Sequence, residues 1–426
     1  MLQIICPAVD RSVFKLKGRY AMTIGYISNY FEMVAGKYLS AVDINPGRSN
    51  QHEIGGIGTF TEVLGRERKE LPAILIYFGE NEEDTVRAEV SVTWYDARRN
   101  QPLRSPEYRL YYPSNEVMQS GSEGDSFIIA QKADDTLLII IARSGSTFES
   151  HLSWLFGVSP GKTFSFREYD NKKDIELGFA ARYILDEIGI ETEYRNENFL
   201  DIMLDRFGGR FPSTREFSSF SRVTIPDVIS PDDPDQAFMM WFEQEELLFR
   251  TLERHIVAKR LAQGFGDDVD EFIKFSLSVL NRRKSRVGHA FENHLEQIFT
   301  DQQIRYSNGP ITENRAKPDF IFPSIANYKN TDFPAALLTM LAVKSTCKDR
   351  WRQVLSEAAR IENKHLITLE PGISVSQTNE MKSHSLQLIV PALLHETYKS
   401  SQQDWLMNIR EFTDMVKERQ KKAFII

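Results

Sequence analysis

The first third of the chain alternates between short apolar runs and polar turns. Residues 88–95 alternate apolar and polar positions, as a half-buried strand does. The β-branched and aromatic runs lie at residues 73–78, 88–95, 108–112, 126–130 and 136–142. Each run is bounded by Gly, Asn, Asp or Ser, the residues that favour turns. This pattern predicts a mostly-β barrel or sandwich, closed by a short helix at residues 147–156.

Helical spacing of apolar residues dominates from about residue 160 onward. The segments that fit helices are 174–188, 236–263, 268–282, 287–303, 351–362 and 402–420. Four strands are predicted among them, at 318–322, 341–345, 365–369 and 386–390. Pro226, Pro231 and Pro234 predict a linker or irregular loop over residues 223–235. Strands mixed with helices predict an α/β domain in this half of the chain.

The two patterns divide the chain into three predicted parts. Residues 1–158 are expected to form the β domain, residues 159–207 a helical linker region, and residues 208–426 the α/β domain. A chain of 426 residues, 41% of them hydrophobic, is long enough for two or three domains with cores of their own.

The net charge of −8 is unusual for a protein that binds nucleic acid. Local neutralisation of phosphates matters more than the total charge. Residues 98–109 carry four arginines and one glutamate, residues 282–286 four basic side chains, and residues 344–352 four basic side chains and one aspartate. Each basic run also fits an ordinary solvated surface.

The sequence predicts an intracellular, membrane-free protein. Cys6 and Cys347 are the two cysteines, too few for a disulfide framework or a zinc site. The first ten residues do not read as a signal peptide, and no stretch reaches the 18 apolar residues of a membrane helix. We therefore expect a cytoplasmic location.

The strongest chemical signal is Pro318-Asp319, followed 25 residues later by Lys344 at the end of an apolar strand. This spacing is typical of metal-dependent phosphodiesterases. Asp319 can ligate Mg²⁺, a hard cation that needs only one or two protein carboxylates. Lys344 can hold a water and the scissile phosphate beside the cation. Aspartates in turns and lysines at strand ends are common, so the spacing alone leaves a structural role open.

The residues around this pair are more informative than the spacing. The relevant segments are Asn281–Arg286, Ile311–Glu313, Lys317–Ser324, Asp332–Pro334, Met340–Gln353, His365–Leu369 and Val390–Pro391. In these segments the chain resembles the EcoRII-type restriction endonucleases, over roughly residues 208–400. The resemblance implies a PD-(D/E)XK nuclease core that cuts DNA with Mg²⁺.

The resemblance also implies roles for the acidic residues. Asp319 and Lys344 take the central positions. The acid that most nucleases of this class carry two residues before the lysine is replaced here by Ala342. In the family a displaced carboxylate on the following helix takes its place, which corresponds to Glu357.

An upstream acid and two further residues complete the implied site. Glu292 matches the upstream acid, and Glu296, one helical turn later, is the competing choice. With Asp319 and Glu357, Glu292 makes up the implied metal ligands. Tyr328 and Lys284 match positions near the family's active site.

Lys348, Asp349 and Arg350 match the segment with which the family reads the C:G pairs of a CCWGG or CCNGG type of site. Lysine and arginine can donate to guanine O6 and N7, and aspartate can accept from cytosine N4. The alternative is a surface salt-bridge run.

The family extrudes the central base pair with residues near 240–250, where this sequence departs from the pattern. Phe242 and Glu246 occupy the aligned positions. Trp241 and Phe242 have rings that can stack on an extruded base, although core packing explains them better.

The β domain resembles the family's effector-binding domain, a B3-like pseudobarrel. Its expected DNA contacts are Arg98, Arg104, Glu107, Arg109 and, from a second loop, His52. A lysine of the pattern is replaced by Pro102. In the family this domain binds a second copy of the DNA site and relieves autoinhibition of the nuclease. An exposed arginine-rich hairpin is the alternative.

The resemblance implies double-stranded DNA as the partner, a homodimer to cut both strands, and a cognate DNA methyltransferase linked genetically without direct binding. Two other functions stay open. One is a sequence-specific DNA-binding protein with an inactive or redirected nuclease, and the other is a repair or modification-dependent nuclease on the same core.

Overall fold

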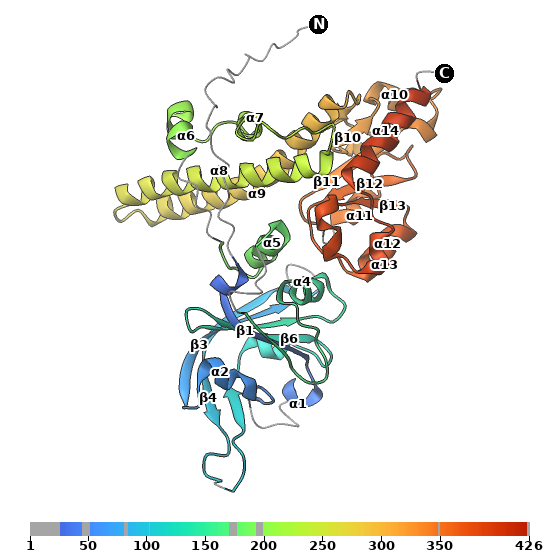
Figure 1. Cartoon of the computed structure of the whole chain (residues 1–426). Helices are drawn as coiled ribbons and strands as arrows, with labels where there is room; N and C mark the ends of the chain where they lie inside the picture. Colours follow the sequence, from blue (N-terminus) through green and yellow to red (C-terminus); the bar gives the residue numbers. More distant parts are fainter. Residues whose placement is uncertain are drawn as a thin grey trace.

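Two β-sheets organise the chain (Figure 1). The structure, a computed structural model, describes residues 26–44, 52–80, 84–101, 103–169, 177–192, 199–347 and 350–423. Pro102, Lys348 and Asp349 therefore lie outside the described residues. None of the helices in the described ranges combines the length and apolarity that crossing a bilayer requires.

The first sheet has eight strands in the order β2-β5-β4-β3-β7-β6-β1-β8. The strands are β1 Phe31–Tyr38, β2 Glu53–Ile54, β3 Lys69–Phe78, β4 Val86–Asp96, β5 Tyr108–Tyr111, β6 Ser126–Lys132, β7 Leu137–Ala142 and β8 Ser165–Glu168. β3 and β7 run parallel, and the other neighbours are antiparallel. The mostly-β character predicted for this part is confirmed.

β7 shows why this sheet is stable. All six of its residues are buried, because apolar side chains leave both faces of the strand. Leu137, Ile139 and Ile141 enter one core, whereas Leu138, Ile140 and Ala142 enter another on the opposite face. A strand covered on both sides reads as a continuous apolar run, as residues 137–142 do.

Short helices cover this sheet. They are α1 Ala41–Ile44, α2 Thr61–Leu64, α3 Glu116–Ser120, α4 Thr147–Phe156 and α5 Phe179–Glu187. α4 lies where it was predicted. It begins at Ser146, whose hydroxyl accepts from the N–H of Glu149, and ends at Gly157, which adopts a left-handed conformation. Both β8 and α5 pack with the first sheet, although they lie beyond residue 158, the predicted end of the β domain. The predicted domain boundaries stay a prediction.

The second sheet has five strands in the order β13-β12-β11-β10-β9. They are β9 Ser307–Asn308, β10 Phe320–Phe322, β11 Thr339–Lys344, β12 Lys364–Thr368 and β13 Leu386–Ile389. β11, β12 and β13 are parallel, and β10 is antiparallel to both β9 and β11. The predicted α/β character of this part is confirmed.

Helices surround the second sheet. They are α6 Leu200–Phe207, α7 Thr214–Val223, α8 Pro234–Gln263, α9 Val269–Asp301, α10 Ile325–Lys329, α11 Trp351–Val354, α12 Val375–Ser383, α13 Ser400–Gln403 and α14 Ile409–Ala423. Phe299 of α9 and Phe412 of α14 both contact the ring of Phe322 in β10, so these two helices cover the same face of the sheet.

Three predicted helices are wrong in their extent. Residues 268–282 and 287–303 form one continuous helix, α9, because the basic residues between them are good helix formers. The helix predicted at 351–362 ends at Val354. Tertiary contacts replace its hydrogen bonds, since Arg360 donates to the carbonyl oxygens of Asn330 and Phe333 at 2.9 Å each.

The two parts of the chain touch through α4 and the loop that follows β12. His151 of α4 is buried, and it donates through Nε2 to the carbonyl of Pro371. The backbone N–H of Ser374 donates to the Thr147 hydroxyl at 3.1 Å. These contacts connect the first sheet to the end of the second sheet at which Lys344 lies.

Candidate active site

Asp319 and Lys344 lie together because of the pairing of β10 with β11. Asp319 directly precedes β10, and Phe320 pairs with Leu341, so Asp319 lies beside the end of β11. The backbone N–H of Val343 donates to Asp319 Oδ2 at 2.6 Å, and Lys344 Nζ lies 3.4 Å from the same oxygen. Both side chains are about one-fifth exposed, which leaves room for a ligand.

Glu357 reaches this pair from an irregular segment, not from the predicted helix. The chain turns after α11, and Ala358 adopts a left-handed conformation with φ of 49°. Such a backbone costs about 1–2 kcal/mol outside glycine and is typical of functional sites. The pKa of Glu357 is raised to about 7, chiefly by burial; the nearby Lys344 opposes this shift and Asp319 adds to it.

Glu292 of α9 faces the same group of charges. Burial raises the pKa of its carboxyl, and the negative charge of Asp319 adds to the effect. Glu296, the competing acid, is already engaged: its two oxygens accept from Arg215 at 2.8 Å and from Asn308 at 2.9 Å. Glu292 is therefore the acid on α9 that shares the environment of Asp319.

These carboxylates fit a divalent cation. Within the described ranges no three His, Cys, Asp or Glu side chains are already gathered around a metal position. Mg²⁺ keeps several waters, so one or two carboxylates suffice. Glu357 Oε2 is buried and has no hydrogen-bond partner among the described residues. Because leaving a buried acceptor unsatisfied costs about 1–3 kcal/mol or more, a cation beside it would be stabilising.

Tyr328 supports the segment that carries Glu357 instead of entering the acidic group. Its hydroxyl donates to Glu313 Oε2 at 2.6 Å and accepts from the backbone N–H of Arg360 at 3.3 Å. Burial, with the hydrogen bond to Glu313, raises the pKa of Tyr328 to about 12. A tyrosine in this state stays protonated and acts as a structural anchor.

Lys284 lies apart from this group. It is exposed on α9, eight residues before Glu292, which is about 12 Å along the helix axis. Lys284 was predicted to lie near the active site, but in this structure it does not lie beside the acidic group.

Comparison with known families finds a match for the part of the chain that holds these residues. Residues 249–413 match the family described as EcoRII C terminal. This part of the chain is similar to that family. Asp319, Lys344, Glu357 and Glu292 all lie within it.

Relatives extend this result. A stretch of 225 residues is 40% identical to the type II restriction enzyme EcoRII of Escherichia coli. This stretch makes up 53% of this chain and 55% of that protein. The chain thus spans about half the length of this curated relative. Two solved structures of metal-depleted Ecl18kI with uncleaved DNA, one of them with modified DNA, are 16% identical and cover 54% and 53% of this chain and 85% and 83% of theirs. Their TM-scores of 0.42 and 0.40 are too low to assign a fold.

Within the residues that match this family, the segment after Lys344 is held at both ends. Cys347 is buried, and its backbone N–H donates to the side chain of Glu370. Arg350 donates its N–H to the Cys347 carbonyl at 2.8 Å and is exposed. Lys348 and Asp349, between these two residues, lie outside the described part of the chain.

Trp241 and Phe242 lie just before the residues that match this family and are buried, with 4% and 3% exposure. Phe242 stacks on Phe238, and Trp241 lies beside His294. The structure therefore favours core packing for these two rings, and a role in stacking on an extruded base stays a prediction.

A buried ionic cluster on α8 and α9 was not predicted. Glu245 Oε2 lies 3.0 Å from His294 Nε2, and Glu245 Oε1 lies 3.6 Å from Arg286 Nη1. All three residues are at most 4% exposed. Arg286 also pairs with Glu246, the residue at the family's base-extrusion position. From sequence, charged residues are expected at the surface. The signal that could have revealed this cluster is that these charged residues occupy positions on the otherwise apolar, buried faces of α8 and α9.

The predicted effector contacts lie on the β4–β5 hairpin, which projects from the first sheet (Figure 1). Arg109 pairs with Glu107 at 2.6 Å and with Glu53, which was not predicted, at 2.7 Å. Arg98 pairs with Glu107 at 2.5 Å. Arg104 is exposed near the tip of the hairpin.

His52 contributes differently from these arginines. Its ring packs edge-on against Tyr112, with the ring centroids 5.4 Å apart. The hairpin therefore presents arginines whose charges are partly neutralised by carboxylates, and His52 lies on a neighbouring strand end.

Proposed function

We propose that this chain is a type II restriction endonuclease that makes Mg²⁺-dependent double-strand cuts in DNA at a CCWGG or CCNGG type of site. The observation that supports this most is the meeting of Asp319, Lys344 and Glu357 within the residues that match the EcoRII C terminal family. The 40% identity to EcoRII over 225 residues agrees with it.

The residues of the site divide the chemistry between them. Asp319 and Glu357 would hold the cation, with Glu292 beside them. When bound, Mg²⁺ supplies a Lewis acid for the phosphoryl oxygen and lowers the pKa of a bound water. Lys344, 3.4 Å from Asp319, would orient that water and the scissile phosphate. Glu357 titrates near neutral pH without a cation, so it can release its proton when the cation binds.

A plasmid digest tests this function against its alternatives. We expect a plasmid with CCAGG, CCTGG or CCCGG sites to be linearised with Mg²⁺, and the same plasmid without such sites to stay intact. Cutting of both plasmids would favour a repair or modification-dependent nuclease. Specific binding without cutting in Mg²⁺ or Mn²⁺ would favour a DNA-binding protein with an inactive nuclease.

Base recognition is proposed for Lys348, Asp349 and Arg350. The exposure of Arg350 and its position six residues after Lys344 support this. Correct base contacts would then help to position the end of β11, which carries Lys344.

Replacing Arg350 by alanine is expected to cost about 1–3 kcal/mol of discrimination at one G:C pair, because a bidentate contact to guanine is lost. The measurement is binding to the cognate site and to a set of single-substitution sites. Arg315→Ala, which removes another exposed arginine of the same domain, serves as a control. A uniform loss of affinity for all sequences would make Arg350 a phosphate contact instead.

The first sheet is proposed to be a B3-like effector domain that binds a second copy of the site and relieves autoinhibition. The arginine-rich β4–β5 hairpin supports DNA contact through Arg98, Arg104 and Arg109, with Glu107 available for a base. The buried contacts of α4 with residues 371–374 support coupling to the nuclease part.

This coupling predicts a dependence on the number of sites. Plasmids with two sites are expected to be cut faster than plasmids with one, and an added cognate oligonucleotide should accelerate the one-site reaction. Arg104→Ala should reduce that acceleration while leaving basal cutting unchanged. Equal rates on both plasmids, unaffected by the oligonucleotide, would rule out the effector role.

We also propose a homodimer, since cutting both strands of a near-palindromic site needs two active sites related by a twofold axis. A cognate DNA methyltransferase is the proposed genetic partner, without direct binding, and the cytoplasm is the proposed location.

A further inference from the structure

α9 carries one apolar face along its whole length, but only half of that face is covered. Towards its C-terminal end the face holds Phe291, Leu295 and Ile298, which are buried in the core of the second sheet. Towards its N-terminal end the same face holds Ile273, Leu277 and Leu280, which are 49%, 54% and 51% exposed. At 100° per residue these six side chains lie within about 60° of one another around the helix.

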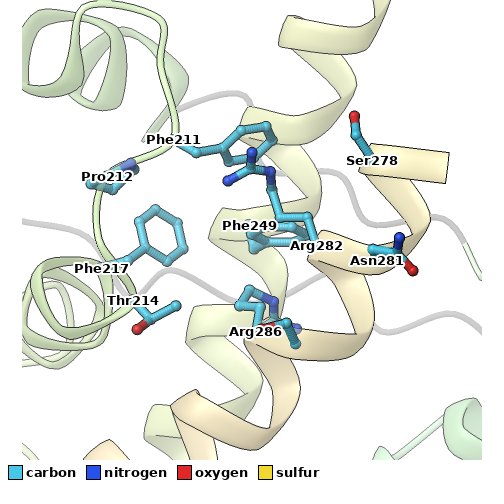
Figure 2. Close-up of a pocket in the computed structure, with 10 residues that line it drawn as sticks. Phe211, Pro212, Thr214, Phe217, Phe249, Ser278, Asn281, Arg282 and Arg286 are labelled. Carbon is cyan, nitrogen blue, oxygen red and sulfur yellow. The ribbon is translucent and has the colours of Figure 1, made fainter. Parts of the chain in front are cut away.

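The uncovered half lies on a projecting hairpin. α8 and α9 run side by side away from the second sheet, and their connection forms the tip (Figure 1). The other side of α9 is already occupied, because Arg282 and Arg286 lie beside Phe211 and Phe249 at a cavity of about 420 Å³ (Figure 2). Arg282 lies over the ring of Phe211 at 4.5 Å. The exposed face therefore differs from the side that the chain covers itself.

The order of residues on this face fits a second α9 lying antiparallel. Asp270, Ile273, Leu277, Leu280 and Lys284 follow one another at alternating spacings of three and four, the heptad pattern of a coiled coil. Residues 267–271 contain four acidic side chains, and residues 282–286 contain four basic ones. A twofold axis near Leu277 brings Ile273 beside the second copy's Leu280 and Asp270 opposite the second copy's Lys284. Apolar and charged positions then match together.

We propose that this face, Asp270 to Lys284 of α9, is a self-association surface for a second copy of the chain. The pairing differs from the one that cuts a single site. Glu292 lies 15 residues, about 22 Å, from Leu277, so the two acidic groups would be about 45 Å apart along the helices. Five base pairs span only about 17 Å. Pairing through this surface would therefore place two cutting centres on separate DNA segments. This consequence rests on the proposed function, whereas the pairing of the two helices does not.

The test is the mass of the full chain by sedimentation velocity at about 1 to 50 μM, without DNA. Leu277→Lys is expected to halve the mass of the largest species, raising its dissociation constant at least about tenfold. The matched control is Leu393→Lys, which replaces a leucine that is 59% exposed elsewhere. It should leave the mass unchanged. A wild-type mass equal to that of Leu277→Lys would overturn the proposal and mean that something other than a second copy covers this face.

A charge exchange keeps the test independent of folding defects. Asp270→Lys and Lys284→Glu should each weaken association, and mixing the two variants should restore it, because both cross-pairs are then again opposite in charge. Failure of the mixture to associate would overturn the antiparallel arrangement. These readouts need no DNA cutting, so they stand if the proposed nuclease activity fails.

Discussion

Replacing Asp319 by alanine is expected to lower the rate of DNA cutting by about 10³-fold or more, with specific DNA binding retained. Asp319 lies 3.4 Å from Lys344 and is the proposed ligand of the cation, whose charge stabilisation contributes several kcal/mol. Lys344→Ala should have a similar effect. The measurement is single-turnover cutting with Mg²⁺, together with binding to the same duplex in its absence.

The control for this experiment is Asp404→Ala, which removes an exposed carboxylate from the same half of the chain. It should cut at the wild-type rate. Full activity of Asp319→Ala would place the cutting centre elsewhere. Loss of binding in both Asp319→Ala and Lys344→Ala would indicate misfolding.

Replacing Glu245 by alanine is expected to destabilise the α8–α9 region by about 1–3 kcal/mol, since it removes the carboxylate that faces the buried His294 and one of the two that face the buried Arg286. The hydrogen bond from His294 offsets the burial of Glu245 and keeps the pKa of this carboxyl low. The measurement is urea unfolding followed by tryptophan fluorescence. Trp241, 6.0 Å from His294, reports on this region.

Glu271→Ala is the matched control, because Glu271 pairs with Arg260 at the exposed tip of the same hairpin. An exposed pair contributes at most about 1 kcal/mol, so the midpoint should hardly change. Equal stability of the two variants would mean that the buried cluster contributes no more than a surface ion pair.

The central pair of the site could be predicted from the sequence because it depends on neighbouring strands. Asp319 precedes β10, Lys344 ends β11, and two adjacent strands bring them together. Glu357 required the resemblance to a family, since its segment is shaped by contacts of Arg360 with residues 328–333 that no local pattern reveals.

Other features escaped prediction for different reasons. β1 contains Gly36 and Lys37, which disfavour a strand in isolation, yet pairing on both sides stabilises it. The cluster of Glu245, Arg286 and His294 consists of polar residues that are ordinarily exposed, and only tertiary pairing makes their burial tolerable. The unbroken course of α9 depends on the helix propensity of its basic residues and also on packing against α8 and the second sheet.

The most direct test of the central claim is a digest of a plasmid with one defined CCWGG site, with both cut ends sequenced. The proposed function predicts Mg²⁺-dependent cleavage of both strands at one fixed position relative to that site, and none with Asp319→Ala. Intact plasmid in both Mg²⁺ and Mn²⁺, from folded protein that binds the site and with a cognate oligonucleotide present, would contradict it.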